Sequence, residues 1–445
     1  MRWGLSLALS VCTLAASVTP FAVRAEDSAA QRSLTDILKE KGVISEEEAN
    51  EATNLEDPKA VPDVRAGYRV GKGLYFEAPN DLFAAYLGTR TQLRFTYDDR
   101  DDRSDEIDFR VRRLKLWVEG YALIPELEYK LQVDIGDGDL QLEDAYLAYV
   151  PFTFAGVKGG QFKVPQGKQE LISSGKLQMV ERSDANDFFN QNRDRGVQLG
   201  GAFLGDALLY TVGIFDGNGP NERNITTDLM YAGRIELTPL GPYPEDECDL
   251  DSVPDPRLTL GASASYNTVS KKDVTVDTIT DSTGAVIDEE VSFDLNSKND
   301  LLNNFIIRGI GKNGLAHDVD LFLWTINAGF KFRGFSFSSE GYIAGSNVHG
   351  GGAEPWASGF YFQSGYFILP QRLEGAIQYS WIDPDHDLAQ ARGIRFMQAL
   401  RGGVSYYIFK QALKIQADLG PIETERPGAS TRHDLEFRTQ VQFIL

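Results

Sequence analysis

The stretch "YLGTRTQLRFTYDD", residues 86–99, alternates between two kinds of side chain. Leu87 and Leu93 fall on one face of an extended chain, and Arg90 and Arg94 fall on the other. Because successive side chains of a strand point to opposite faces, the segment is predicted to be a strand with two different surroundings. In a soluble sandwich the apolar face would be the core. In a membrane barrel the apolar face would meet lipid and the arginines would line water.

The spacing of the other strands favours the barrel. Sixteen segments with the same alternation are predicted between residues 86 and 445. Connections at one end are mostly short, such as 333–334, and those at the other are mostly long, such as 165–195. Segments 137–139 and 239–256 are exceptions to this sorting. Such a meander is typical of bacterial outer-membrane proteins, so the predicted fold is all-β, a sixteen-stranded antiparallel transmembrane β-barrel with a short N-terminal helical extension.

Three regions are predicted along the chain. Residues 1–25 carry Arg2, an apolar run and a Val-Arg-Ala ending, which is the pattern of a secretory signal peptide. Residues 26–62 contain two capping-box patterns and are predicted to form a periplasmic helical extension and linker. Residues 63–445 are predicted to form the barrel, with an inward-folded loop near 165–195.

Composition excludes several classes of function. The formal net charge of -21 disfavours nucleic acid as a partner. No apolar run approaches the ~20 residues that a transmembrane helix needs. Cys12 lies in the predicted signal peptide, so Cys248 alone remains and an intrachain disulfide is excluded. The four histidines have no metal-site spacing, and neither a metal nor a cofactor is predicted.

Four stretches resemble a known family. They are "FRVRRLKLWVEG", "LEDAYLAYVPF", "VKGGQFKVPQGKQELISSGKLQMVERSDANDF" and "NRDRGVQLGG", and together they resemble the phosphate-selective porin O and P family most densely over residues 86–216. The resemblance implies a sixteen-stranded barrel, a homotrimer, and passive conduction of anions through a channel narrowed by inward-folded loops. The alternation alone indicates the barrel and its strand number, but neither the trimer nor phosphate.

Passage of anions needs fixed cationic donors that replace part of the hydration shell, as rings of arginine or lysine do. Arginines on the inward face of adjacent strands are predicted to form a basic ladder on one wall, and the loop at 165–195 adds further cations. The predicted pore-lining and anion-binding residues are Arg90, Arg94, Arg110, Arg112, Lys163, Lys168, Lys176, Arg182 and Arg193. In the alternative interpretation, the arginines pair with inward carboxylates such as Glu119, Glu128 and Asp134 and keep the lumen neutral.

The outer loops depart from the family pattern. They include "DDRDDRSDE" at 98–106 and "IDEEVSFD" at 287–294, where basic residues would be expected. An acidic mouth repels anions over roughly a Debye length, ~8 Å at physiological salt. The sequence therefore predicts an outer-membrane porin for small hydrophilic solutes, with anions such as phosphate crossing a basic constriction. A general or cation-leaning porin controlled by the acidic loops is the alternative.

An enzyme is not predicted. Ser173, Ser174 and Ser183 are the candidate nucleophiles for an outer-membrane hydrolase, which is the remaining alternative. No histidine lies in a context that marks it as their base. The expected partners are small solutes or ions, outer-membrane lipid and lipopolysaccharide.

Overall fold

The computed structural model describes residues 45, 64–101, 104–224, 226–270, 274–280, 286–293, 318–349, 356–384, 396–425 and 430–445. For 274–280 and 286–293 it describes the backbone alone. The predicted signal peptide and, apart from Ser45, the predicted extension at 26–62 lie outside these residues. The side chains of the acidic stretch at 287–294 also lie outside them.

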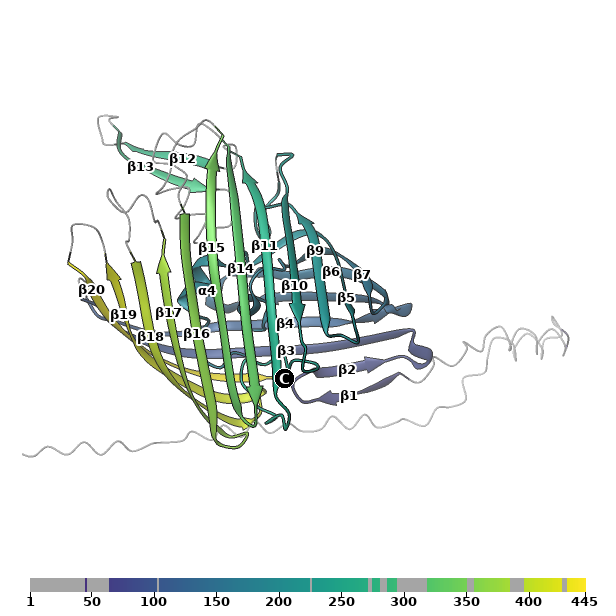
Figure 1. The fold of residues 1–445 in the computed structure, drawn as a ribbon. Coiled ribbons are helices and arrows are strands. Elements are labelled where there is room, and N and C mark those ends of the chain that lie inside the picture. The colour runs from purple at the N-terminus through teal and green to yellow at the C-terminus, as the bar shows by residue number, and fades with distance from the viewer. Residues whose placement is uncertain are drawn as a thin grey trace, which may run out of the picture. The chain divides into compact units, whose positions relative to one another are not determined.

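Sixteen antiparallel strands close into a barrel (Figure 1), which confirms the predicted fold class. They are β3 (Phe83–Asp99), β4 (Glu106–Ala122), β5 (Ile124–Asp134), β6 (Gln141–Phe152), β7 (Ala155–Lys163), β8 (Arg193–Phe203), β9 (Leu208–Phe215), β10 (Met230–Leu237), β11 (Arg257–Val269), β14 (Val319–Phe332), β15 (Phe335–Val348), β16 (Trp356–Leu369), β17 (Leu373–Asp383), β18 (Phe396–Phe409), β19 (Leu413–Glu425) and β20 (Arg432–Ile444). The last strand pairs with the first, from Leu435 opposite Asp99 to Ile444 opposite Arg90. Closure leaves no open edge in this part of the sheet, so the backbone groups can pair with their neighbours within lipid.

The tight turns gather at one end of the barrel. At the β14–β15 turn, Arg333 and Gly334 have φ angles of 49° and 85°. Two successive positive φ angles give a mirror-image turn, whose twist matches that of the flanking strands. The connections at the opposite end are longer, apart from the short 135–140 segment with the 3-10 turn Gly136–Gly138. The long segment at 238–256 lies on the short-turn side, as the sequence indicates.

Two hairpins of the structure are not among the strands predicted from the sequence. β1 (Arg65–Arg69) and β2 (Gly73–Glu77) pair with each other, and β2 pairs with the first part of β3, from Leu74 opposite Leu87. This hairpin prolongs the sheet where β20 ends, and a 3-10 turn at Pro79–Asp81 joins it to β3. β12 (Val274–Thr280) and β13 (Val286–Phe293) pair within the predicted connection 268–318. Strands of five to eight residues carry too few alternations to stand out in a sequence.

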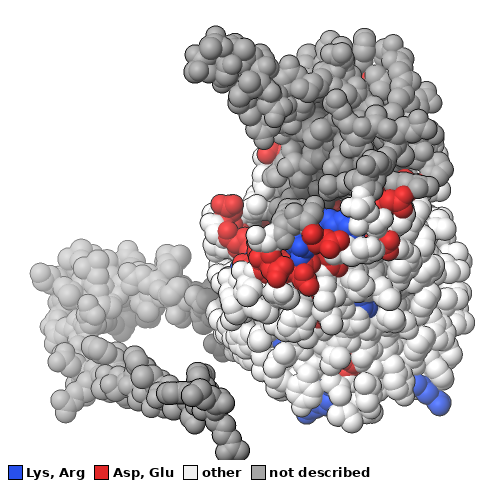
Figure 2. Space-filling view, turned by 90° about the vertical axis from the view of Figure 1, so that its left-hand side faces the viewer, with Lys and Arg blue, Asp and Glu red and all other residues white. Residues whose placement is uncertain are grey.

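The distribution of polarity across the wall is the reverse of that in a soluble protein. On the outside, Phe109 is 78% exposed and Leu93 is 51% exposed. On the inside, Gln92 is fully buried, and Lys115 is buried as well. On the face shown in Figure 2, charged side chains are few between one acidic band and a set of cationic groups at the lower edge. An apolar exterior around a polar interior is what a lipid environment requires of a barrel.

Within the described part of the chain, no helix is long and apolar enough to span a membrane.

Residues 164–192, named here the inward loop, connect β7 to β8 and fold into the barrel. The loop contains α3 (Lys168–Leu171) and α4 (Asp184–Phe189). The hydroxyl of Ser183 caps α4 by accepting a hydrogen bond from the backbone amide of Asn186 at 3.1 Å. Figure 1 shows α4 inside the ring of strands.

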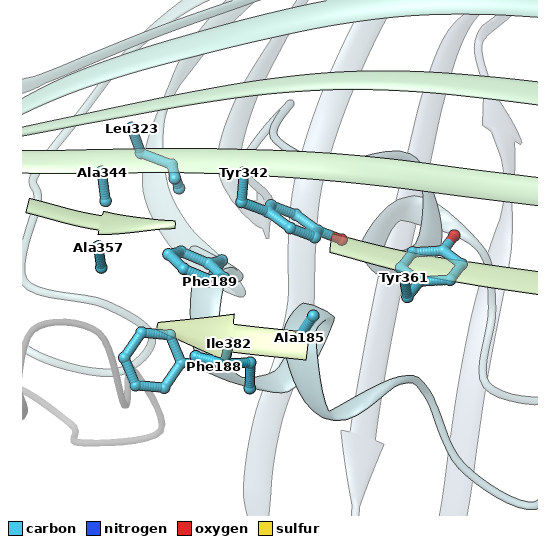
Figure 3. Close-up of a cluster of buried hydrophobic side chains, with 9 residues drawn as sticks. All are labelled: Ala185, Phe188, Phe189, Leu323, Tyr342, Ala344, Ala357, Tyr361 and Ile382. Carbon is cyan, nitrogen blue, oxygen red and sulfur yellow. The ribbon is translucent and has the colours of Figure 1, made fainter. Parts of the chain in front are cut away.

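Apolar packing fixes α4 against one side of the barrel. Its side chains pack among residues of β14–β17, as Figure 3 shows. Phe189 is fully buried, and its ring stacks on that of Tyr342 with centroids 5.1 Å apart and planes 3° apart. We call β14–β20 the packed wall, because these strands contact the inward loop over much of their inner surface.

Residues 238–256, named here the second inward loop, meet the inward loop from the other end. The carboxylate of Glu247 accepts hydrogen bonds from Gln178 N at 2.8 Å, Gln169 Nε2 at 2.9 Å and Gln363 Nε2 at 3.0 Å. Cys248 packs in an apolar cluster with Tyr407, and burial raises the pKa of its thiol well above its usual value. This segment therefore holds the inward loop on the packed wall.

Candidate pore and anion site

A cavity of about 820 Å³ lies between the inward loop and the opposite side of the barrel. In the described residues its lining comes from β3–β10, the 135–140 connection and the inward loop. We call β3–β10 the basic wall. The packed wall contributes no described residue to the lining, because the inward loop covers it.

Cations outnumber anions in this lining. The eleven cationic residues are Arg90, Arg110, Arg112, Arg113, Lys115, Lys130, Lys158, Lys163, Arg182, Arg193 and Arg234. The seven acidic residues are Asp134, Asp137, Glu143, Asp144, Glu170, Glu181 and Asp187. The formal charge of the lining is therefore +4 in a chain whose total charge is -21.

A β-bulge on β4 places two consecutive arginines on the lumen side. Gln92 pairs with Arg113 but Leu93 pairs with Val111, so Arg112 is the extra residue. An extra residue shifts the alternation by one, so both guanidinium groups reach the lumen. The sequence carries the signal, because the apolar positions change phase between Val111 and Leu114.

A second bulge, on β6, places two consecutive carboxylates on the lumen side. Gln132 pairs with Asp144 but Val133 pairs with Leu142, so Glu143 is the extra residue. Glu143 and Asp144 both line the cavity. Sequence reasoning missed them and missed Arg113 and Lys115, because strict alternation was assumed along each strand.

Glu181 of the inward loop is held by three arginines of β3 and β4. Its carboxylate lies 2.9 Å from Arg94, 3.0 Å from Arg112 and 2.9 Å from Arg113. Burial alone would raise the pKa of Glu181, but these three guanidinium groups outweigh it and hold the pKa well below its usual range. Glu181 is thus a fixed anion that ties the inward loop to the basic wall.

Glu170 holds the first part of the inward loop in place through similar ion pairs. Its carboxylate lies 3.2 Å from Arg182 and 3.7 Å from Lys163. Burial would raise its pKa, but Arg182 and Lys163 outweigh that effect and lower it. Lys163 also donates to the carbonyl oxygens of Glu170 and Ile172. These contacts fix both the loop and the cations beside the cavity.

Arg193 and Lys115 form ion pairs with the two consecutive acidic residues of β6. Arg193 lies 2.8 Å from Asp144 and 3.4 Å from Glu143, and Lys115 also pairs with Glu143. Asp134, on β5, lies 3.5 Å from Lys115. The cluster is compensated internally, as buried charges generally must be.

Arg90 differs from these cations because it has no ion-paired carboxylate among the described residues. It is 6% exposed and donates to the hydroxyls of Ser173 at 2.8 Å and Ser174 at 2.9 Å. Its Nε atom is buried without a hydrogen-bond partner. A desolvated guanidinium with neutral partners keeps most of its positive potential for a ligand in the cavity.

The structure brings six of the nine sequence-predicted site residues to the cavity. These are Arg90, Arg110, Arg112, Lys163, Arg182 and Arg193. Arg94 lies behind the lining, where it contacts Glu181 and Gln440. Lys168 pairs with Glu236 of β10, and Lys176 lies 2.6 Å from Glu245 of the second inward loop, whose side chain is exposed.

The predicted carboxylate partners of the arginines are mostly different in the structure. Glu119 lies 3.0 Å from Lys130, and Asp134 pairs with Lys115. Arg94 and Arg112 instead contact Glu181 of the inward loop. Arg110 lies 3.1 Å from Asp108 and 3.9 Å from Asp137. A prediction confined to regular strands could not find Glu181, because its position depends on how the loop folds.

Asp187 of α4 is an acidic group on the cavity lining whose charge depends on pH near neutrality. The residue is exposed to the cavity, but the protein around it reduces the solvation of its carboxylate, and the neighbouring Glu181 carboxylate repels a second negative charge. Together these effects raise the pKa of Asp187 to about 7. The net charge of the lining therefore changes between weakly acidic and weakly basic conditions.

The three serines that were candidate nucleophiles have other contacts. Ser173 and Ser174 accept hydrogen bonds from Arg90, and Ser183 caps α4. In the described residues, none of the three is hydrogen-bonded to a histidine. Their hydroxyls orient an arginine and a helix.

Acidic side chains gather at the long-loop end, where β3, β4 and β20 meet (Figure 2). Arg100 lies 2.6 Å from Glu106 and 3.3 Å from Asp98. The backbone amide of Asp101 donates to Asp434 at 3.1 Å. The charge of this rim is thus opposite in sign to that of the cavity.

The barrel, its apolar exterior and its polar lumen define a bacterial outer-membrane porin. The chain belongs to the phosphate-selective porin O and P family, whose model matches residues 85–443. A comparison with curated protein sequences gives no match.

Solved structures share the fold at low sequence identity. The anion-selective porin from Comamonas acidovorans is 11% identical, with a TM-score of 0.52, covering 81% of this chain and 99% of that one. The outer membrane channel DcaP of Acinetobacter baumannii is 13% identical, with a TM-score of 0.50, covering 83% and 99%. The trimer form of OmpT, an outer membrane protein of Vibrio cholerae, is 9% identical, with a TM-score of 0.51, covering 81% and 99%.

Proposed function

We propose that the protein is an anion-preferring porin through which small hydrophilic anions, including phosphate, diffuse down their gradients. In this proposal Arg90, Arg110, Arg112, Lys163, Arg182 and Arg193 line the constriction and meet the anions. Arg94, Lys168 and Lys176 act indirectly by holding the inward loop and the segments that it contacts. The proposal assigns the protein passive conduction and no catalytic step.

The observation that carries the proposal is the buried guanidinium of Arg90. Its Nε has no protein partner, and its other contacts to the inward loop are neutral hydroxyls. Leaving a buried charge without a counter-charge is costly, and a passing anion would supply one. The surplus of four cations over the whole lining supports the same direction of preference.

The acidic residues of the lining favour the passage of anions through the pore over their retention. Conduction requires binding that is favourable enough for the ion to enter and weak enough for it to leave. Glu181, Glu170 and Glu143 each neutralise neighbouring cations, so the lining is only modestly positive for its size. An anion would move between donors and meet no deep trap.

A general or cation-leaning porin is the second candidate, and the acidic rim is the observation that favours it. Cations concentrate at such a rim, and anions are repelled within about one Debye length. Preference then depends on whether the rim or the constriction dominates. The rim lies at the long-loop end, and the basic residues lie inside the barrel beside the inward loop. In this proposal the constriction dominates, because an ion sheds more of its water there.

The proposal also covers the oligomeric state of the protein and its location in the cell. A signal peptide at 1–25 would direct export, and residues 26–62 would lie in the periplasm. The barrel would form a homotrimer in contact with lipid and lipopolysaccharide. Support comes from membership of a porin family and from the trimer form of the OmpT structure. A trimer would migrate at three times the monomer mass on unheated gels and collapse to the monomer on heating.

The test is the zero-current potential of the purified protein in a planar bilayer under a KCl gradient. We expect chloride preference, weakened by Arg90→Gln, and a chloride current reduced by millimolar phosphate. Lys414→Gln is the matched control, because it removes a buried positive charge from the packed wall, none of whose described residues lines the cavity. Potassium preference in the unmodified protein, or equal effects of the two variants, would contradict the proposal.

A further inference from the structure

Lys158 is the second cation of the cavity lining that has no ion-paired carboxylate in the described chain. It lies on β7, and its contacts are aromatic. The Nζ atom lies 4.3 Å from the ring centroid of Phe162 and 5.2 Å from that of Tyr146. An ammonium above ring faces is stabilised by their quadrupoles and retains its net charge.

The two rings that contact Lys158 belong to an apolar part of the barrel interior. Phe162 is buried in a cluster with Phe215 and Met230, and Tyr146 packs against that cluster. The rings of Tyr146 and Phe162 are perpendicular, with centroids 6.1 Å apart. Tyr146 is half-buried and lines the cavity, so part of its ring faces the lumen.

The neutral polar residues nearby complete this part of the lining. Gln198, from β8, and Thr211, from β9, also line the cavity. In the strand register Lys158 lies opposite Gln198. The carboxylate that acts most strongly on Lys158 is that of Asp144, and Asp144 is itself paired with Arg193 at 2.8 Å. The ammonium of Lys158 therefore has no ion pair of its own and can attract an anion from the lumen.

We infer that Lys158 and Tyr146 form a binding position for organic anions that carry an aromatic or other flat apolar body. The carboxylate of such a solute would pair with the Lys158 ammonium, and its body would lie against the ring of Tyr146. This inference rests on the proposed function and specifies a solute class for the pore.

An organic anion gains more at this position than an inorganic one. Both gain the electrostatic attraction of the ammonium, but only a solute with an apolar body also removes apolar surface of Tyr146 from water. Aromatic pairs add about 0.5–1.5 kcal/mol beyond area burial, which corresponds to roughly a two- to tenfold difference in half-saturating concentration. The expected preference is therefore moderate, as suits a solute that must leave.

The experiment compares benzoate with acetate as inhibitors of the chloride current through the full mature protein in a planar bilayer. We expect the half-inhibiting concentration of benzoate to be about two- to tenfold lower than that of acetate. Tyr146→Leu should abolish this ratio, and Tyr146→Phe, which keeps the ring, should preserve it. Lys158→Gln should weaken both inhibitors, and Lys158→Arg should restore them.

Lys414→Gln is the control, because it removes one positive charge from the packed wall, none of whose described residues lines the cavity. It should leave the ratio of benzoate to acetate unchanged. A ratio of one in the unmodified protein, or a ratio insensitive to Tyr146→Leu, would overturn the inference. Chloride preference with equal half-inhibiting concentrations of benzoate and acetate would contradict this inference alone. Potassium preference in the KCl gradient would contradict the proposed function on which the inference rests.

Discussion

The basic wall and the packed wall both turn polar side chains inward, but those side chains contact different groups. On the packed wall, Gln416 Nε2 donates to the carbonyl oxygens of Leu177 and Met179, and Lys414 donates to that of Leu177 at 2.8 Å. On the basic wall, Arg90 contacts neutral hydroxyls and lines the cavity. An inward polar residue is therefore a pore residue only where no loop covers it.

The two walls also divide the work of holding the inward loop. The packed wall binds the loop through apolar contacts, hydrogen bonds to its backbone and an ion pair between Arg401 and Asp184. None of the described residues of this wall lines the cavity. The basic wall binds it through Glu181 and Glu170, which also set the charge of the lumen. Changes on the packed wall should thus alter pore size and stability, and changes on the basic wall should alter selectivity.

The largest expected effect comes from removing the main apolar anchor on the packed wall. Phe189→Ala deletes a fully buried ring stacked on Tyr342, which costs about 3–5 kcal/mol at a buried site. The inward loop should loosen, so single-channel conductance should rise and the thermal transition should fall. Phe362→Ala, on the outer face of β16, is the control and should leave the conductance unchanged. An unchanged conductance in Phe189→Ala would mean that α4 does not limit the pore.

The next effect is expected at Glu181, the anion shared by three arginines of the basic wall. Glu181→Gln leaves Arg94 and Arg113 without an ion-paired carboxylate among the described residues, whereas Arg112 keeps Asp137 at 3.3 Å. The change should destabilise the barrel by about 3 kcal/mol. Anion preference should increase, because the lining gains one positive charge. Chemical unfolding and the zero-current potential measure the two effects. If Glu181→Gln lowers the stability of the barrel without changing its anion preference, Glu181 has a structural role only.

The lowered pKa of Glu181 gives this contribution a definite pH dependence. The stabilisation is present above the unfolded carboxylate pKa of about 4.3 and is lost as pH falls through the lower folded pKa. The unmodified protein should therefore lose stability below about pH 4 more steeply than Glu181→Gln. Parallel acid unfolding curves for the two proteins would contradict this assignment.

A smaller effect is expected from Asp187, whose pKa is raised to about 7. Below this pH the carboxyl is protonated and the lining is more positive, and above it the lining loses up to one charge. Anion preference should therefore decrease between about pH 6 and pH 8, as measured by the zero-current potential. Asp187→Asn should remove the pH dependence and hold the low-pH preference. Persistence of the transition in that variant would locate the titrating group elsewhere.

The smallest effect is expected at Gly175. A Cβ atom there would lie 2.6 Å from Arg90 Nη1, so Gly175→Ala should displace the flexible end of that arginine. Anion preference should fall slightly, with little change in stability. Gly402→Ala is the control, because a Cβ atom at that position meets no atom within 4 Å. Equal behaviour of the two variants would show that the placement of Arg90 is not critical.

The sequence was sufficient for the barrel, because one rule of alternation applies to every strand wherever lipid lies on one side and polar groups lie on the other. The same rule placed Arg90 and Arg112 in the lumen. It failed at the bulges, where Arg113 and Asp144 are brought inward by a shift of one residue. The change of phase in the apolar positions is visible in the sequence and would have revealed both.

The other errors concern loops. The sequence predicts that Lys168 and Lys176 line the pore, because their loop is expected to fold inward. The loop does fold inward, but which of its side chains face the cavity depends on its packing against β14–β17 and on the second inward loop. Those contacts join residues far apart in the chain, and no local pattern indicates them. The role of Glu247 in joining the two loops was hidden for the same reason.

The most direct test of the account compares one cation from each wall in the same measurement. The zero-current potential under a KCl gradient is recorded for the unmodified protein, for Arg90→Gln on the basic wall and for Lys414→Gln on the packed wall. Each substitution removes one buried positive charge from the barrel interior. The account predicts chloride preference that weakens in Arg90→Gln and persists in Lys414→Gln. Equal loss in both variants, or potassium preference in the unmodified protein, would contradict it.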